Sequence, residues 1–140
     1  MKPPESKPFD RKQSEALTAA AREASAHAYA PYSRFHVGAA VLADDGRVFT
    51  AANVENASYG LTSCAERNAI FAAVSAGVRQ IVAVAIHTPT AKPVPPCGAC
   101  RQVIHEFGPH ATVVSCCDGN QIRSWSLGEL LPSAFGPDVL

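Results

Sequence analysis

The run Ile81-Val82-Ala83-Val84-Ala85-Ile86 is the sequence feature that most limits the possible folds of this chain. Every residue in it is apolar, and its length suits a β-strand better than a helix. A strand with no polar alternation is covered on both faces, because neither side of it can face water. We therefore expect a central strand over residues 81–86, with helices packed on both sides of the sheet.

Patterns on either side of this run predict a mixed sheet. The turn signals Asp44-Asp45-Gly46 and Asp118-Gly119-Asn120 each favour an antiparallel hairpin. The expected flanking strands are 37–42, 47–50, 112–117 and 121–125. The expected helices are 10–30, 64–76, 97–107 and a short one at 126–132, where Ser126 and Glu129 have capping-box spacing. This order predicts an α/β fold: a three-layer α/β/α sandwich around a mixed five-stranded sheet, whose second and third helices connect neighbouring strands.

The size and composition of the chain restrict its class. At 140 residues we expect a single domain over 9–140, preceded by a flexible N-terminal tail at 1–8, which is rich in Pro and Lys. Twelve basic and twelve acidic side chains give no net charge, which argues against a nucleic-acid partner. No apolar run resembles a signal sequence or a membrane span, and the Cys-x-x-Cys spacing is typical of metal chemistry in a reducing compartment. We expect a cytoplasmic protein without a membrane partner.

Three of the five cysteines begin predicted helices. Cys64 starts the second helix, and Cys97 and Cys100 start the third. The N-termini of crossover helices follow the carboxyl ends of strands, so the three sulfurs can converge. Helix N-termini favour thiolates, and thiolates favour zinc. Catalytic zinc sites use three protein ligands and keep a fourth position for water, so this trio predicts a catalytic site.

Glu66 has two interpretations. Ser63 and Glu66 match the S-x-x-E capping box, which needs no chemistry. A carboxylate near a zinc site can instead move protons to and from a substrate. Cys64-Ala65-Glu66 and Pro96-Cys97-Gly98-Ala99-Cys100 fit the three-cysteine form of the zinc nucleobase deaminase signature. The pairing favours a catalytic Glu66, with capping as a companion role in the metal-free protein.

With these motifs the sequence resembles the homotetrameric zinc-dependent cytidine deaminase family. The similarity spans nearly everything after the tail, and the Asn-x-Glu and Leu-Leu-Pro-x-x-Phe motifs point to the nucleoside branch. The matching segments are 29–33, Phe35, 37–40, 53–57, 64–67, 96–103, 130–132 and Phe135.

The resemblance implies hydrolytic deamination of free cytidine and 2′-deoxycytidine to uridine and 2′-deoxyuridine, with release of ammonia, in pyrimidine salvage. One Zn²⁺ per subunit would be held by Cys64, Cys97 and Cys100, and Glu66 would transfer the protons. The alternative is a deaminase of a cytosine nucleoside antibiotic such as blasticidin S, whose motifs look similar. A structural zinc module would leave Glu66 without a role, and a polynucleotide-editing deaminase would need a cationic path for the strand.

The resemblance also assigns substrate contacts. It implies that Asn53 and Glu55 hydrogen-bond the ribose hydroxyls, that Phe35 packs on the substrate, and that Tyr59 and Phe135 complete the pocket of a neighbouring subunit in a homotetramer. Without the zinc motifs, residues 53–56 alone favour a plain polar strand end, and Phe135 is equally an apolar anchor for a loose tail.

Two arginines directly follow the motifs. The resemblance implies that Arg67 hydrogen-bonds a ligand sulfur, which would offset the negative charge of three thiolates around zinc. We expect Arg101 to be a solvated cation on a helix face. The backbone of Ala65 is expected to help orient the base.

Overall fold

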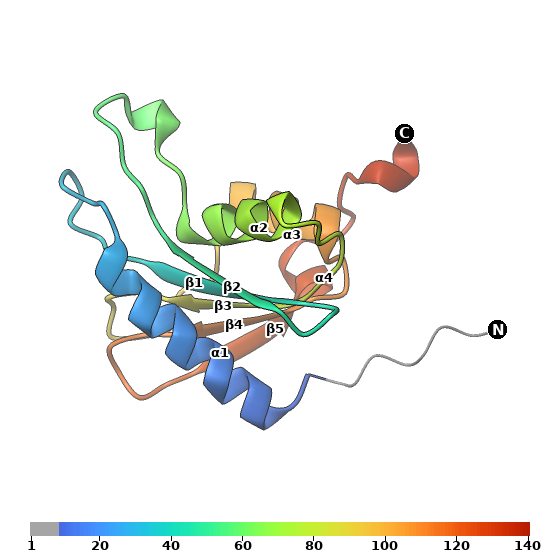
Figure 1. Ribbon diagram of the computed structural model, residues 1–140, viewed down its shortest axis with the longest axis horizontal. Helices are drawn as coiled ribbons and strands as arrows, with labels where there is room; N and C mark the ends of the chain where they lie inside the picture. The colour runs from blue at the N-terminus through green and yellow to red at the C-terminus, as the bar shows by residue number, and fades with distance from the viewer. Residues whose placement is uncertain (1–8) are drawn as a thin grey trace.

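The computed structural model describes residues 9–140, and the expected N-terminal tail lies outside the described residues (Figure 1). The predicted α/β class is confirmed. In chain order the main elements are α1 (Arg11–Ala24), β1 (Gly38–Ala43), β2 (Val48–Ala52), α2 (Ala65–Ser75), β3 (Ile81–His87), α3 (Gly98–Phe107), β4 (Thr112–Cys116), β5 (Arg123–Ser126) and α4 (Leu127–Leu130). Within the described part of the chain, no helix is long and apolar enough to cross a bilayer.

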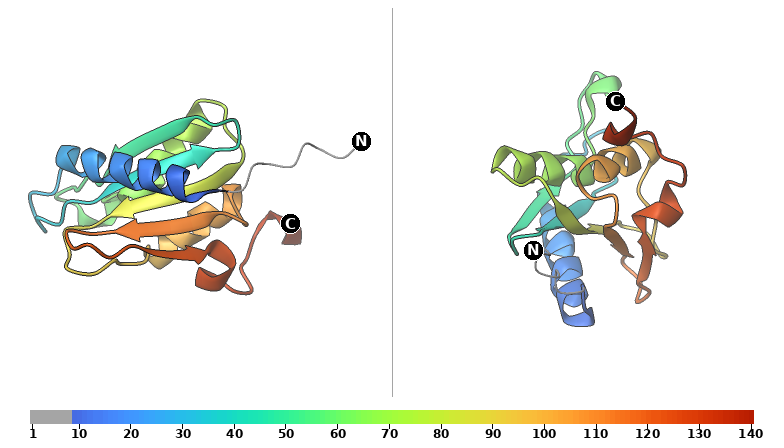
Figure 2. Two further views of the ribbon diagram at one scale, coloured as in Figure 1. Left: turned by 90° about the horizontal axis from the view of Figure 1, so that it is seen from below. Right: turned by 90° about the vertical axis from the view of Figure 1, so that its right-hand side faces the viewer.

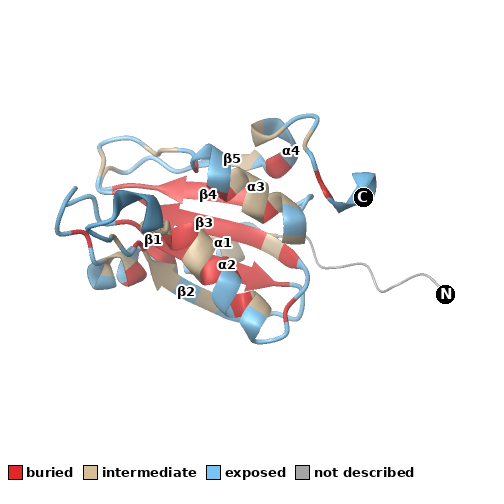
Figure 3. Ribbon diagram, turned by 90° about the horizontal axis from the view of Figure 1, so that it is seen from above, coloured by how far each residue is buried: buried red, intermediate tan, exposed pale blue. Residues whose placement is uncertain are grey.

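Helices cover both faces of a five-stranded sheet whose strand order is β2-β1-β3-β4-β5. α1 lies on one face, and α2 and α3 lie on the other (Figures 1 and 2). The predicted central strand is β3, and Figure 3 shows β1, β3 and β4 as the buried middle of the sheet. The three-layer sandwich expected from the sequence is therefore present.

The side chains of β3 divide between two cores. Ala83 and Ala85 pack in a small core beneath α1 with Leu17 and Ala21. Val84 and Ile86 belong to the larger core beneath α2 and α3, which also contains Ile70 and Ile104. This alternation follows from the two-residue period of a strand, and it explains why the whole run is apolar.

The sheet connectivity differs from the expectation in one respect. β3 and β4 are parallel neighbours joined through α3, as predicted, and both hairpins are antiparallel. α2, however, connects β2 to β3, and these strands are separated by β1, which pairs with β3 antiparallel. The prediction that α2 joins neighbouring strands is wrong, because the β1–β2 hairpin places β1 rather than β2 against the central strand.

The first helix also ends earlier than expected. α1 stops at Ala24 and continues only as a 3₁₀ turn over Ser25–His27. The backbone N–H of Tyr29 donates to the carbonyl of Asn53 at 3.0 Å, so this part of the chain pairs with the segment after β2 instead of extending the helix. Pro31, which from sequence is expected to end the helix because the residue before a proline disfavours helical geometry, lies too far along the chain to end α1.

Candidate metal centre and active site

The three predicted cysteines converge at the N-termini of two adjacent helices. Cys64 is the N-cap of α2, Cys97 is the N-cap of α3, and Cys100 lies in the first turn of α3. The Sγ atoms of Cys64 and Cys97 are 3.9 Å apart, those of Cys97 and Cys100 are 3.5 Å apart, and all three lie within 4.8 Å of one another. β2 and β3 are both antiparallel to β1 and so run in the same direction, which places the starts of the helices that follow them, α2 and α3, at the same edge of the sheet.

The sulfur geometry fits zinc. A tetrahedral ion with Zn–S bonds of about 2.3 Å places its sulfurs about 3.8 Å apart, close to the measured separations. All three cysteines are free thiols. Among residues 9–140, no fourth His, Cys, Asp or Glu ligand atom joins this group. The donor set is therefore that of an open site with three protein ligands.

Protons and charges are unevenly distributed over the sulfurs. The pKa of Cys64 falls to about 5, because the Cys100 thiol and the Arg67 guanidinium both donate hydrogen bonds to its sulfur. Arg67 Nη2 lies 3.2 Å from Cys64 Sγ. The pKa of Cys100 is raised, because its thiol donates to Cys64 and is buried. Cys64 is thus ready as a thiolate at neutral pH, and metal binding must displace the proton of Cys100.

Glu66 lies in the first turn of α2, and only 5% of its surface is exposed. Burial raises the pKa of this carboxyl, and the adjacent Cys64 thiolate raises it further. A raised pKa makes this carboxyl easier to protonate than an exposed one, which suits a group that accepts and returns protons in general acid–base chemistry.

The capping-box interpretation of Glu66 is wrong. Cys64 is the N-cap of α2 and makes no side-chain cap, and the hydroxyl of Ser63 donates to Asn68 Oδ1 at 2.6 Å instead. The helix begins one residue later than a Ser63 cap requires, which leaves Glu66 free to face the sulfurs.

A cavity of about 230 Å³ joins Glu66 to the cysteines. This volume lies a little below the usual range for drug-sized ligands, so the cavity suits one small molecule. Its lining combines apolar walls with a few polar groups: Phe35, Val37, Asn53, Thr62, Cys64, Ala65, Glu66, Ile86, Thr88, Val94, Pro95, Pro96 and Cys97.

Comparison with known proteins decides the family. The model for the "Cytidine and deoxycytidylate deaminase zinc-binding region" matches residues 11–116. The chain belongs to this deaminase family.

Similar proteins agree over most of their length. The chain is 57% identical over 111 residues to a cytidine deaminase from Halalkalibacterium halodurans, covering 77% of this chain and 83% of that protein. It is 47% identical over 128 residues to the cytidine deaminase of Sporosarcina psychrophila, covering 90% and 93% of the two chains. The crystal structure of the Burkholderia pseudomallei cytidine deaminase superposes with a TM-score of 0.84 at 52% identity, covering 86% of this chain and 98% of that one. The zinc cofactor expected from the sequence is therefore supported by both the family and the sulfur geometry.

Within this deaminase fold, Asn53 lines the cavity but is also a structural anchor. Its Oδ1 accepts from the Val37 N–H at 2.9 Å, and its Nδ2 donates to the Phe35 carbonyl at 2.7 Å. These bonds hold the segment that carries Phe35 and leads into β1 against Asn53, the residue that follows β2. Within the polar segment 53–56, Asn53 alone is buried, with 8% of its surface exposed.

Glu55 lies in an adjoining hollow of about 350 Å³, which shares Thr62 with the main cavity and also contains Tyr59. Its Oε1 accepts from the backbone N–H groups of Tyr32 and Ser33 at 3.0 and 3.1 Å, and its Oε2 accepts from the Ser33 hydroxyl. These bonds lower the pKa of Glu55, the Ser33 hydroxyl most of all. The carboxylate therefore also orders the turn that precedes Phe35.

The two aromatic residues expected to act across subunits do not line the main cavity. Tyr59 is 74% exposed and Phe135 is 63% exposed. The Tyr59 ring packs edge-on against Tyr32, 5.7 Å between centroids. Among the described residues of a single chain, both side chains therefore keep most of their surface exposed.

Arg101 contradicts its predicted role as a solvated cation. It is half-buried and donates from Nε to the Pro96 carbonyl and from Nη1 to the Leu130 carbonyl, both at 2.8 Å. Its position directly after the Cys-x-x-Cys motif was the only sequence signal, and that position does not reveal distant carbonyl partners.

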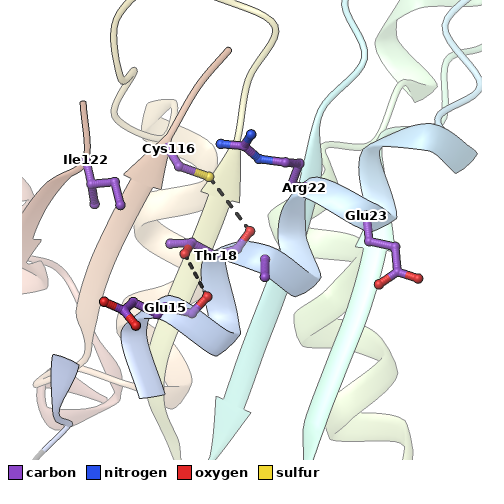
Figure 4. A pocket seen from close by; sticks show the side chains of 7 residues that line it. Glu15, Thr18, Arg22, Glu23, Cys116 and Ile122 are labelled. Carbon is purple, nitrogen blue, oxygen red and sulfur yellow. Dashed lines mark hydrogen bonds between the residues drawn. The ribbon is translucent and has the colours of Figure 1, made fainter. Parts of the chain in front are cut away.

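A larger hollow of about 390 Å³ lies on the opposite face of the sheet, between α1 and β4 (Figure 4). Thr18, Arg22 and Cys116 line it, and the Cys116 thiol faces the Thr18 carbonyl at 3.8 Å. None of the predicted site residues line this hollow, so it is separate from the thiol centre.

Proposed function

We propose that this protein catalyses the hydrolytic deamination of free cytidine and 2′-deoxycytidine to uridine and 2′-deoxyuridine, with release of ammonia, in pyrimidine salvage. The observation that carries the proposal is a buried carboxyl, Glu66, which lines one small cavity together with Cys64 and Cys97, two of the three converging thiols. The relatives named cytidine deaminase support this substrate class, because the chain matches them over most of their length.

Cys64, Cys97 and Cys100 would hold one zinc ion in each subunit. Bound zinc supplies Lewis-acid chemistry, which lowers the pKa of a coordinated water to about 7. Arg67 donates to the Cys64 sulfur, and its positive charge offsets part of the negative charge of the thiolates.

Glu66 moves the protons. Its carboxylate accepts a proton from the attacking water and passes it to N3 of the cytosine, which makes C4 more electrophilic. It then takes the second proton of the added water and delivers it to the departing amino group. One water is consumed and one ammonia is released, so Glu66 returns to its starting state.

The substrate would enter between Phe35 and the start of α2. Phe35 offers an aromatic face for the base, and the backbone of Ala65 lies at the cavity wall where it can orient the base edge. Asn53 and Glu55 would bind the ribose hydroxyls. Both retain capacity for this, because within residues 9–140 one N–H of the Asn53 amide and a lone pair of Glu55 Oε2 make no hydrogen bond.

The assembly we propose is a homotetramer in which Tyr59 and Phe135 complete the pocket of a neighbouring subunit. Their large exposed aromatic surfaces support this, because burying them against another chain gains apolar area. The proposed compartment is the cytoplasm, which suits five free thiols. Zero net charge favours a small nucleoside over a polynucleotide.

The test is an ultraviolet assay of cytidine conversion by the zinc-loaded protein, with blasticidin S assayed in parallel. Glu66→Gln should keep zinc and lose turnover by at least about 100-fold, the scale of general acid–base catalysis. Glu23→Gln, an exposed carboxylate on α1, is the matched control and should keep full turnover. Near-normal turnover of Glu66→Gln would reject the proton-transfer role, and exclusive turnover of blasticidin S would reject the substrate.

A further inference from the structure

The side chain of Arg101 connects two distant parts of the chain. Its Nε donates to the carbonyl of Pro96, the residue before Cys97, and its Nη1 donates to the carbonyl of Leu130, the last residue of α4. Arginine is suited to this because its planar group carries donors in a rigid fork, so little side-chain freedom is lost for each bond formed.

The same helix also holds the chain beyond α4. Gln102 Nε2 donates to the carbonyl of Phe135 at 2.8 Å. Gly136 is buried so close to His105 that a Cβ there would lie 2.6 Å from Nε2 of the imidazole. Arg101, Gln102 and His105 therefore form a docking face on α3 for residues 130–136, which run beside this helix in Figure 2.

The bond to Pro96 acts directly on the metal centre. The peptide unit between Pro96 and Cys97 is planar, so holding the Pro96 carbonyl oxygen also sets the direction of the Cys97 N–H and Cα. The φ angles of Pro95 and Pro96 are restricted by their rings, so the orientation of the Pro96–Cys97 peptide unit is the main conformational freedom left in the segment that leads into α3. Cys97, the N-cap of α3, makes no side-chain cap of its own.

We propose that Arg101 is a positioning residue of the metal centre, which holds Cys97 in place for zinc and links that position to the docked C-terminal segment. The part concerning Cys97 rests on its proposed role as a zinc ligand. Partners of this kind, one shell beyond the ligands, typically contribute 10- to 100-fold to metal affinity. Loss of Arg101 therefore weakens zinc retention as well as the packing of residues 130–136.

Arg79 provides a matched control. Its Nη1 donates to the carbonyls of Val74 and Val78 at 3.0 and 2.8 Å, at the end of α2 that is remote from Cys64. Arg79→Ala therefore removes two arginine–carbonyl bonds, as Arg101→Ala does, without touching the approach to Cys97. Gln102→Ala is a second control, since it loosens only the Phe135 contact.

The experiment follows the transfer of zinc from the loaded protein to a chromophoric chelator, together with the visible spectrum of the cobalt-loaded protein and the urea midpoint. Arg101→Ala should speed zinc transfer by at least about tenfold and alter the cobalt–thiolate bands. Arg79→Ala and Gln102→Ala should stay within about twofold of the wild type. Arg101→Lys, which can reach only one carbonyl, should give an intermediate rate and serves if the alanine variant does not fold.

The inference is overturned if Arg101→Ala and Arg79→Ala transfer zinc at equal rates. If Arg101→Ala does not fold, a wild-type rate of zinc transfer from Arg101→Lys overturns it instead. Its failure is distinct from failure of the proposed function. If the wild type does not convert cytidine but Arg101→Ala still releases zinc faster, the proposed reaction is wrong and the positioning role stands. If the wild type converts cytidine and the Arg101 variant holds zinc normally, the proposed reaction stands and the positioning role is wrong.

Discussion

Replacing Asn53 tests whether one side chain both anchors the Phe35 segment and lines the active site. Asn53→Ala removes the acceptor of the buried Val37 N–H and the donor to the Phe35 carbonyl. An unsatisfied buried N–H costs about 1–3 kcal/mol, and the partly buried carbonyl, which can reach water, loses a bond worth about 0.5–1.5 kcal/mol. We therefore expect the free energy of unfolding to fall by about 1.5–4.5 kcal/mol.

Urea unfolding of the metal-free protein measures this loss without interference from zinc. Asn56→Ala is the control on the same segment, because Asn56 is exposed and its side chain accepts one hydrogen bond, from the nearby Ser58 N–H. It should cost less than about 0.5 kcal/mol. If Asn53→Ala costs no more than Asn56→Ala, the anchoring role is refuted and only a substrate contact remains for Asn53.

Two further results are expected. Glu66→Gln should stabilise the metal-free protein at neutral pH, because the raised pKa of Glu66 in the folded state makes the wild type less stable as the pH rises from the unfolded-state pKa through the folded-state pKa. The gain in the free energy of unfolding, measured with urea, should vanish near pH 4.5. A gain that stays constant with pH would contradict this sign. Gly38→Ala should cost about 3 kcal/mol or more, because a Cβ there would lie 1.9 Å from the carbonyl oxygen of Ala21 in α1. Gly60→Ala, whose Cβ meets no atom within 4 Å, should change stability by less than about 0.5 kcal/mol, and equal effects of the two would reject the close helix–sheet contact.

The central strand and the metal centre were the most predictable parts of the molecule. In a chain of this size, an uninterrupted apolar run of strand length predicts a central strand buried on both faces, and β3 is such a strand. The convergence of Cys64 with Cys97 and Cys100 followed from helix positions alone, because helices that flank a central strand begin at the same edge of the sheet.

Features that depend on tertiary contacts were harder to predict from the sequence. The S-x-x-E spacing is a real capping box at Ser126 and Glu129 but not at Ser63 and Glu66, where the helix starts at a cysteine. Local spacing cannot tell these cases apart, because the choice depends on what each carboxylate faces in three dimensions. The two carbonyl partners of Arg101 were hidden for the same reason, since one of them lies 29 positions away.

The two-sided packing of β3 has a consequence for how the protein tolerates change. Ala83 and Ala85 set how near α1 sits, whereas Ile86 belongs to the other core and also forms part of the cavity wall. Enlarging either alanine therefore displaces a helix that carries none of the thiols. Shortening Ile86 by one methylene, with Ala85 unchanged, instead alters the space available to a bound molecule. Adjacent positions on one strand therefore control two different properties, the position of α1 and the size of the cavity.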